Sequence, residues 1–338
     1  MKMTPSYTQR LTMVKLNALQ YPLIDEIILD STYSVEPLKS NNEFETLVEE
    51  FKNEFGYTSL NTFSCTKEGF LSLFLSLNRK IAISLGESEA LILAGRLYES
   101  LGNSVSWISL NVNGKLNYKE CENLDVDYLF VSSYVMDTFV ETSLEKIKKL
   151  CTAKLISNCS ANKYAKSADM IYFDAYKLCG YGVCGVILYS NDELEEQYAG
   201  ETDALGLKLI YQALKTQSYT SKNKDEFVQV LENEFEENLH FFVQPQSTLP
   251  YTLHFGLKDI KAREIIRTLS LNDILVTNGE GCSLGLSRPS RIIQNMGYEE
   301  SKSRWALSFT FTQDYTTTQI ENIVKTLSRK YRQIKALS

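Results

Sequence analysis

The sequence predicts an α/β protein in which a mainly parallel sheet is covered by helices and followed by a smaller α+β unit. Between residues 60 and 189, seven short apolar runs alternate with amphipathic stretches. Strands that alternate with helices in this way favour a parallel sheet with helices on both faces. After residue 250 the strand and helix patterns become shorter and indicate a second unit. A chain of 338 residues is long enough for two such domains.

Each element of the first unit is predicted from its own pattern. The seven predicted strands are Leu60–Ser64, Lys80–Ser84, Ser104–Leu110, Tyr128–Ser132, Lys154–Ser157, Asp169–Phe173 and Val183–Tyr189. The helices predicted between them are Thr66–Leu77, Glu87–Leu101 and Ser143–Cys151. Residues 191–239 are charged and helical in pattern, and we expect them to bridge the two units.

A proline-flanked stretch, Gln244–Leu249, is typical of a linker. The strands predicted after it are Tyr251–Leu257, Ile274–Thr277 and Trp305–Thr312, and the helices are Lys258–Leu269, Pro289–Met296 and Thr317–Lys335. We therefore expect a large domain over residues 1–245, with an N-terminal arm over about 1–25, and a small domain over residues 246–338.

Composition argues against several functional classes. The net charge is −7 and no basic stripe is visible, so a nucleic-acid partner is not expected. No apolar run approaches the roughly 18 residues that span a bilayer, and residues 1–16 lack the apolar core of a secretory signal. A cytoplasmic location is the expectation. The seven cysteines form no Cys-x-x-Cys pair, and the only histidines are His240 and His254, so no metal site is predicted.

Lys177 is the most informative single residue. It follows the strand predicted at Asp169–Phe173 and precedes a turn rich in glycine. Ligands of parallel sheets gather at the carboxyl ends of strands, and a desolvated lysine there can trap a carbonyl group. A lone lysine is more often a solvated surface charge. Cys282 lies between Gly281 and Gly285; it reads either as a buried small side chain or as a thiol on a mobile loop.

Several motifs in order along the chain resemble the cysteine desulfurases, in the class V aminotransferase group. Asp174-Ala175-Tyr176-Lys177 resembles their Ser-(Ala/Gly)-His-Lys motif. The segment from Ile274 to Ser283 resembles their Ile-x-Val-Ser-x-Gly-Ser-Ala-Cys-Ser segment, and Leu249-Pro250-Tyr251-Thr252-Leu253 resembles their Leu-Pro-Asn-Thr-Leu strand. Weaker similarity runs from about Ile28 to Lys335.

The resemblance implies a fold-type I enzyme dependent on pyridoxal 5'-phosphate (PLP), usually a homodimer. Lys177 would form the Schiff base with the cofactor and later carry a proton. Cys282 would take the sulfur of L-cysteine, or of a similar small amino acid, as a persulfide and leave alanine. A protein could then accept that sulfur.

The same alignment assigns further cofactor residues and shows departures. Ser64 and Thr66 lie in the turn that holds the phosphate, where a helix N-terminus can help. Asn158 stands where the family has the Asp that binds the pyridine nitrogen, so the electron sink should weaken. Ser88 stands in place of the histidine that stacks on the ring. Asn158 could instead be a structural hydrogen-bonding residue, and Ser64 and Thr66 could be helix caps.

Three more positions complete the expected site. Asp174 and Tyr176 flank the lysine, and Tyr176 stands where the family has a histidine. The arginine that binds the substrate carboxylate aligns near Ala306. Arg304 lies two residues away and could replace it if both sit on one strand, because positions i and i+2 share a face.

Three functions remain open from the sequence. The first is a PLP enzyme of the cysteine desulfurase kind. The second is a diverged, non-catalytic paralogue that binds or regulates a partner as a dimer, suggested by the replaced site residues. The third is a class V aminotransferase with another amino-acid substrate, in which Cys282 is incidental.

Overall fold

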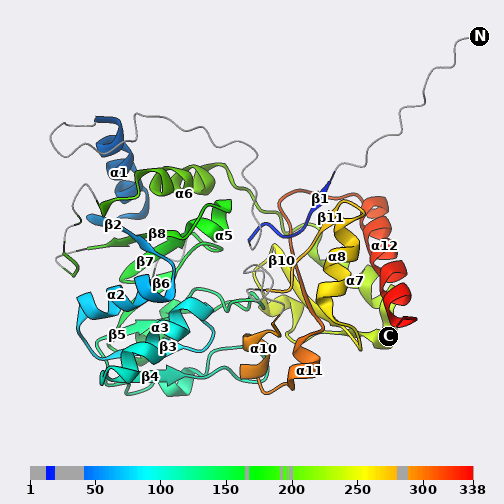
Figure 1. The fold of residues 1–338 in the computed structure, drawn as a ribbon, viewed down its shortest axis with the longest axis horizontal. Coiled ribbons are helices and arrows are strands. Elements are labelled where there is room, and N and C mark those ends of the chain that lie inside the picture. Colours follow the sequence, from blue (N-terminus) through cyan, green and yellow to red (C-terminus); the bar gives the residue numbers. More distant parts are fainter. Residues whose placement is uncertain are drawn as a thin grey trace, which may run out of the picture.

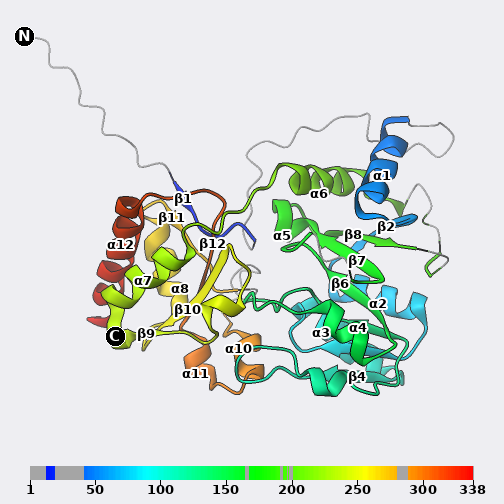
Figure 2. The same cartoon turned by 180° about the vertical axis from the view of Figure 1, so that it is seen from behind.

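The computed structural model describes residues 13–19, 42–163, 167–190, 193–195, 197, 201–279 and 288–337. In Figure 1 the large sheet and the helices that cover it lie on the left. A smaller unit, built mainly from the last third of the chain, lies on the right. The reverse view in Figure 2 shows the same division. The α/β fold expected from the sequence, with its second α+β unit, is confirmed.

The large sheet has seven strands in the order β2-β8-β7-β6-β5-β3-β4. Strands β3 to β7 pair in parallel, whereas β8 is antiparallel to both β7 and β2. The strands are β2 (Ser59–Ser64), β3 (Ile81–Ser84), β4 (Val105–Ile108), β5 (Tyr128–Phe130), β6 (Lys154–Asn158), β7 (Met170–Asp174) and β8 (Cys184–Tyr189). Each coincides with a predicted strand, because strands buried on both faces are nearly continuous apolar runs.

Two apolar layers sandwich this sheet, and alternate residues of each strand face opposite layers. Helices α2 (Lys67–Leu77) and α3 (Glu89–Ser100) cover one face, where Ile156 and Tyr172 contribute to the same buried cluster. Helices α1 (Asn42–Phe55), α4 (Leu144–Leu150) and α6 (Ala204–Thr216) cover the other, with Leu155 and Phe173. The helical residues predicted after 191 thus include a helix of the large unit.

The second unit has its own core and a three-stranded sheet in the order β12-β10-β9. Its strands are β9 (Leu239–His240), β10 (Thr252–Leu257), β11 (Ile274–Leu275) and β12 (Ala306–Thr310). Its helices are α7 (Lys224–Phe235), α8 (Ala262–Ser270), α10 (Arg291–Asn295), α11 (Glu300–Ser303) and α12 (Thr317–Lys335). Strand β1 (Val14–Lys15) pairs in parallel with β11.

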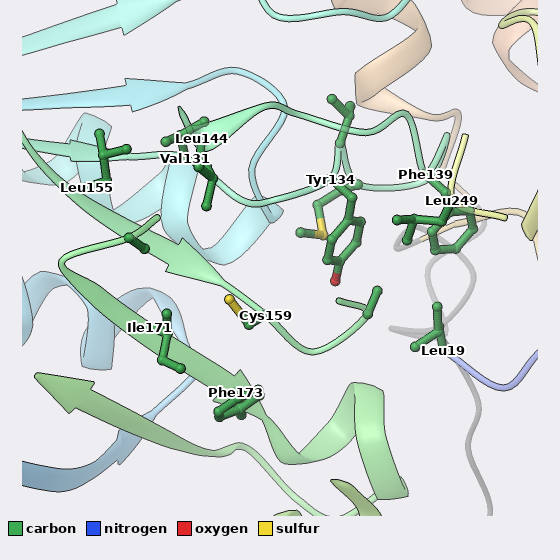
Figure 3. Close-up of a cluster of buried hydrophobic side chains, with 14 of the residues drawn as sticks. Leu19, Val131, Tyr134, Phe139, Leu144, Leu155, Cys159, Ile171, Phe173 and Leu249 are labelled. Carbon is green, nitrogen blue, oxygen red and sulfur yellow. The ribbon is translucent and has the colours of Figure 1, made fainter. Parts of the chain in front are cut away.

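The predicted domain boundary at residue 245 stays a prediction. Two segments before it pack in the second core: Leu16 beside β1, and Phe227 and Leu231 of α7. The cluster in Figure 3 crosses between the units, since Leu249 and Phe139 lie together at one end of it and Ile171 and Phe173 at the other. Residues 131–140 are buried, and apolar packing joins the two units there.

A search of the described helices finds none that is both long and apolar enough to cross a bilayer. In the same part of the chain, no group of three or more His, Cys, Asp and Glu side chains is arranged to hold a metal ion.

Candidate functional site

Lys177 lies at the carboxyl edge of the large sheet, in the short helix α5 (Ala175–Cys179) that follows β7 directly. Asp174 caps this helix, because its carboxylate accepts the backbone N–H groups of Tyr176 and Lys177. Gly180 ends the helix with a left-handed φ of 69°, which glycine adopts without strain. Lys177 is only 8% exposed. Most of this side chain is thus shielded from solvent, and its role in binding a cofactor stays a prediction.

The turn from β2 to α2 lies beside this lysine. Ser64 pairs with Cys184 across β2 and β8, and Gly185 pairs with Asp174 across β8 and β7. Burial raises the pKa of the Cys65 thiol well above its usual value, with the Asp174 charge adding to the rise and the Lys177 charge opposing it. The register across β2, β8 and β7 places this turn and the end of β7, which Lys177 follows, at the same edge of the sheet.

Ser64 and Thr66 are both engaged in that turn. The Ser64 hydroxyl donates to Thr66 Oγ1 at 3.1 Å, and Thr66 Oγ1 accepts the Gly69 N–H at 3.2 Å as the N-cap of α2. The Thr66 side chain also hydrogen-bonds the Glu68 carboxylate, which contributes to the lowered pKa of Glu68 after its own backbone N–H and Lys67. This turn therefore offers hydroxyls and a helix N-terminus to an anion.

Asn158 ends β6 and is 1% exposed. Its Oδ1 accepts the Ser160 N–H at 2.9 Å, and Ser160 Oγ accepts the Asp174 N–H at 2.9 Å. This chain of bonds ties the end of β6 to the end of β7. Because Oδ1 is already bound, the Asn158 amide NH₂ is the group left to donate to a ligand.

Ser88 serves as the N-cap of α3 and accepts the Leu91 N–H at 3.4 Å. Its neighbour Glu87 is 1% exposed, and the carboxylate accepts bonds from the Ser132 backbone N–H, from Ser132 Oγ at 2.8 Å and from the Tyr172 hydroxyl at 3.4 Å. The sequence argument missed this buried carboxylate. The one sequence feature that could have indicated it is the position of Glu87 after Gly86 and the strand that ends at Ser84.

Arg304 is not brought to this edge. It is the C-cap of α11 and lies outside β12, which begins at Ala306, so the assumption that both sit on one strand was wrong. Its guanidinium donates to Glu300 at 2.6 Å. It lines an open groove of about 710 Å³ whose other lining residues all belong to the second unit.

Cys282 lies outside the described residues, but both flanks of its segment rest on the large unit. Gly279 packs against Asp137 so closely that a Cβ would lie 2.4 Å from its carboxyl carbon. The Ser290 hydroxyl donates to Asp137 Oδ2 at 2.8 Å, and Arg288 donates to Glu89 at 3.0 Å. Asp137 and Glu89 therefore hold the chain on either side of residues 280–287.

A cluster of buried polar residues contacts Asp137. The sequence patterns did not predict it. The Ser308 hydroxyl donates to the Asp137 carbonyl at 3.0 Å, and His254 Nδ1 lies 2.9 Å from Ser308 Oγ. Burial lowers the pKa of His254 to about 3, so its ring is neutral. Asp137 itself has a φ of 61°, a conformation that costs energy for a non-glycine residue. The structural role expected for His254 agrees with this packing.

The described residues fit PLP whose ring nitrogen is unprotonated. Lys177 supplies a buried amine, the start of α2 offers donors to a phosphate, and the Asn158 amide can donate to a pyridine nitrogen but cannot neutralise a pyridinium. The Asp174 carboxylate accepts the backbone N–H groups of Tyr176 and Lys177, so it points toward the start of α5. The fit is thus to a weakly activated cofactor.

The fold is that of NifS-like proteins of known structure. The solved structures that resemble the chain include a NifS-like protein (TM-score 0.72, 13% identity, 94% of this chain and 99% of the other). A NifS-like protein from Rickettsia africae has a TM-score of 0.70 at 16% identity, covering 95% and 100% of the two chains. The likeness to NifS-like cysteine desulfurases recognised in the sequence is thus confirmed at the level of the fold.

Sequence comparison gives a shorter match. A cysteine desulfurase from Nostoc sp. is 26% identical over 90 residues, which is 27% of this chain and 22% of the relative. The alignment thus spans about a fifth of the length of the curated relative. No protein-family profile matches the chain.

Proposed function

We propose that this chain binds PLP through Lys177 and removes sulfur from L-cysteine or a similar small amino acid. The observation that carries the proposal is the burial of Lys177 beside donors from two other strand ends, Asn158 and the start of α2. The fold shared with NifS-like proteins and the short match to a cysteine desulfurase support it. A homodimer in the cytoplasm and a protein that accepts the sulfur belong to the same proposal.

The residues would divide the work as follows. Lys177 would hold the cofactor covalently and, once released by substrate, would move a proton at its Nζ atom. Asn158 would donate to the ring nitrogen, and Ser64 and Thr66 would bind the phosphate with the N-terminus of α2. When bound, PLP supplies a ring that withdraws electrons from an attached amino acid. Cys282 would take the sulfur atom as a persulfide, while alanine leaves.

The absorption spectrum tests the cofactor. We expect purified protein with added PLP to absorb visible light and borohydride to fix the cofactor to the peptide that contains Lys177. Lys177→Ala should abolish this fixation, and Lys149→Ala, at an exposed position of α4, should keep it. Fixation that persists in Lys177→Ala would show that another amine binds the cofactor.

Substrate turnover separates the three functions. Alanine released from L-cysteine, and lost in Cys282→Ser, would support the desulfurase. Turnover of another amino acid that is unchanged in Cys282→Ser would support an aminotransferase instead. Protein that stays colourless with excess PLP would favour a non-catalytic dimer, the alternative suggested by Asn158 and Ser88 in place of the charged and aromatic side chains of the family.

A further inference from the structure

One serine is hydrogen-bonded to both of the strand ends that lead to Asn158 and Lys177. Ser160 lies two residues after β6 and is 2% exposed. Its backbone N–H donates to Asn158 Oδ1 at 2.9 Å, and its hydroxyl oxygen accepts the Asp174 N–H at 2.9 Å. Ser160 therefore contacts the last residue of β6 and the last residue of β7.

The Ser160 hydroxyl continues the pairing of β6 and β7 where the backbone of β6 turns away. The Cys159 N–H still donates to the Tyr172 carbonyl at 2.9 Å, but the Cys159 carbonyl accepts the Asn162 N–H at 3.1 Å as the chain turns. The Asp174 N–H thus finds its acceptor in a side chain. An alanine at position 160 would remove that acceptor, and a shielded N–H without one costs stability.

Asp174 transmits this constraint to Lys177. Its carboxylate accepts the Tyr176 N–H at 2.9 Å and the Lys177 N–H at 3.4 Å, so it fixes the first turn of α5. The helix has only 5 residues, and so short a helix depends on its cap and its packing rather than on its own propensity. The place of the Lys177 side chain therefore follows the place of Asp174.

The same serine sets the direction of the Asn158 amide. An asparagine side chain carries an acceptor oxygen and a donor NH₂, and a half turn exchanges the two. The bond from the Ser160 N–H selects the orientation in which Oδ1 faces Ser160. Asn158 is 1% exposed, so water does little to stabilise the reverse orientation.

We propose that Ser160 is a positioning residue that holds the Asn158 amide and the Lys177 amine in one fixed arrangement. It acts on Asn158 through its backbone N–H, and on Lys177 through its hydroxyl and Asp174. The inference rests on the proposed function, because the two groups act together only on a ligand that contacts both. Substitution of the side chain keeps the N–H and removes only the hydroxyl, so Ser160→Ala isolates the effect on Lys177.

Labelling of Lys177 tests the inference without a cofactor. The full chain is dialysed against hydroxylamine, which releases carbonyl compounds bound to amines, and is then methylated with formaldehyde and cyanoborohydride. Peptide mapping gives the rates at Lys177 and at Lys149, an exposed residue of α4. We expect Ser160→Ala to raise the Lys177 rate about fivefold or more, because loss of a buried hydrogen bond favours local opening at α5. The Lys149 rate should stay the same.

Two variants separate positioning from a general loss of stability. Ser160→Thr keeps the hydroxyl and should restore the slow rate at Lys177. Ser157→Ala removes a similarly buried serine hydroxyl of β6 that makes no hydrogen bond to β7, so it should leave the Lys177 rate unchanged. A Lys177 rate in Ser160→Ala equal to that of the unmodified chain would overturn the inference, and so would equal increases in Ser160→Ala and Ser157→Ala. If Ser160→Ala does not fold, Ser160→Cys carries the test, because a thiol is a weaker acceptor and should give an intermediate rate.

Addition of PLP distinguishes this inference from the proposed function. Failure of borohydride to fix PLP at Lys177 of the unmodified chain would refute the proposed function, and the labelling rates would still decide the role of Ser160. If PLP is fixed, the midpoint of the pH-dependent change in visible absorption should shift in Ser160→Ala and stay in place in Ser160→Thr and Ser157→Ala. A midpoint unchanged in Ser160→Ala would count against positioning of the Lys177 amine.

Discussion

Lys224 offers a prediction whose magnitude follows from the structure. It begins α7, is 7% exposed, and its Nζ donates to Thr248 Oγ1 at 2.8 Å and to the Thr248 and Leu249 carbonyls at 3.1 and 3.0 Å. These hydrogen bonds link the start of α7 to Thr248 and Leu249, which precede β10. Burial lowers its pKa from 10.5 to about 8, although the charges of Asp225 and Glu141 act in the opposite direction.

The lowered pKa makes stability depend on pH with a definite sign. Between pH 8 and 10.5 the unfolded chain keeps the Lys224 proton while the folded chain releases it, so Lys224 adds stability as pH rises. At about 1.4 kcal/mol per pH unit, the full difference between 10.5 and about 8 amounts to about 3.5 kcal/mol. Most of it should appear between pH 8 and pH 10.

Urea unfolding of the unmodified chain and of Lys224→Met at pH 7, 8, 9 and 10 measures this contribution. Other groups titrate in the same range, but they are common to both proteins, and the difference between the two free energies of unfolding isolates Lys224. We expect that difference to move in favour of the unmodified chain as pH rises from 8 to 10. A difference that stays constant over this range would refute the assignment of a depressed pKa to this amine.

The remaining predictions concern the site and the second unit. If PLP is bound, Asn158→Asp should increase alanine release from L-cysteine, because a carboxylate would favour a protonated ring nitrogen; equal or lower release would contradict that role. Asp137→Ala should lower the free energy of unfolding by about 1.5–3 kcal/mol, because it removes the charged acceptor of Ser290, and urea denaturation measures this loss. Thr316→Ala should cost about 1 kcal/mol in the same assay, because the capping box with Gln319 begins α12; an unchanged midpoint would show that the cap contributes nothing.

Much of the fold could be predicted because it rests on local patterns. The seven apolar runs became the seven strands of one sheet, and Thr66, Ser88 and Ser143, which the predicted helices included in their first two residues, are the N-caps of those helices. Strand periodicity and helix caps depend on neighbouring residues alone. The predicted helices and strands of the second unit also appear, with ends that differ by a few residues.

The candidate site could be predicted only in part. The position of Lys177 after a buried strand was sufficient to expect a buried amine. The contacts around it were not visible, because they join residues far apart in the chain: Glu87 with Ser132, and Asp137 with Ser290. The prediction that Arg304 shares a strand with Ala306 was wrong for a local reason, because Arg304 is the C-cap of α11 and precedes β12.

The sequence by itself determined the order of the elements and the place of Lys177 at the end of β7, because hydrophobic periodicity encodes which segments are buried. Only the tertiary structure decided what surrounds that lysine. Strand order brings the ends of β2, β6 and β7 to one edge, and packing of distant segments buries His254 and the hydroxyls of Tyr219 and Tyr251. Burial of a polar atom and the partner it finds depend on chain segments that no local pattern relates, so they are fixed only when the whole chain is folded.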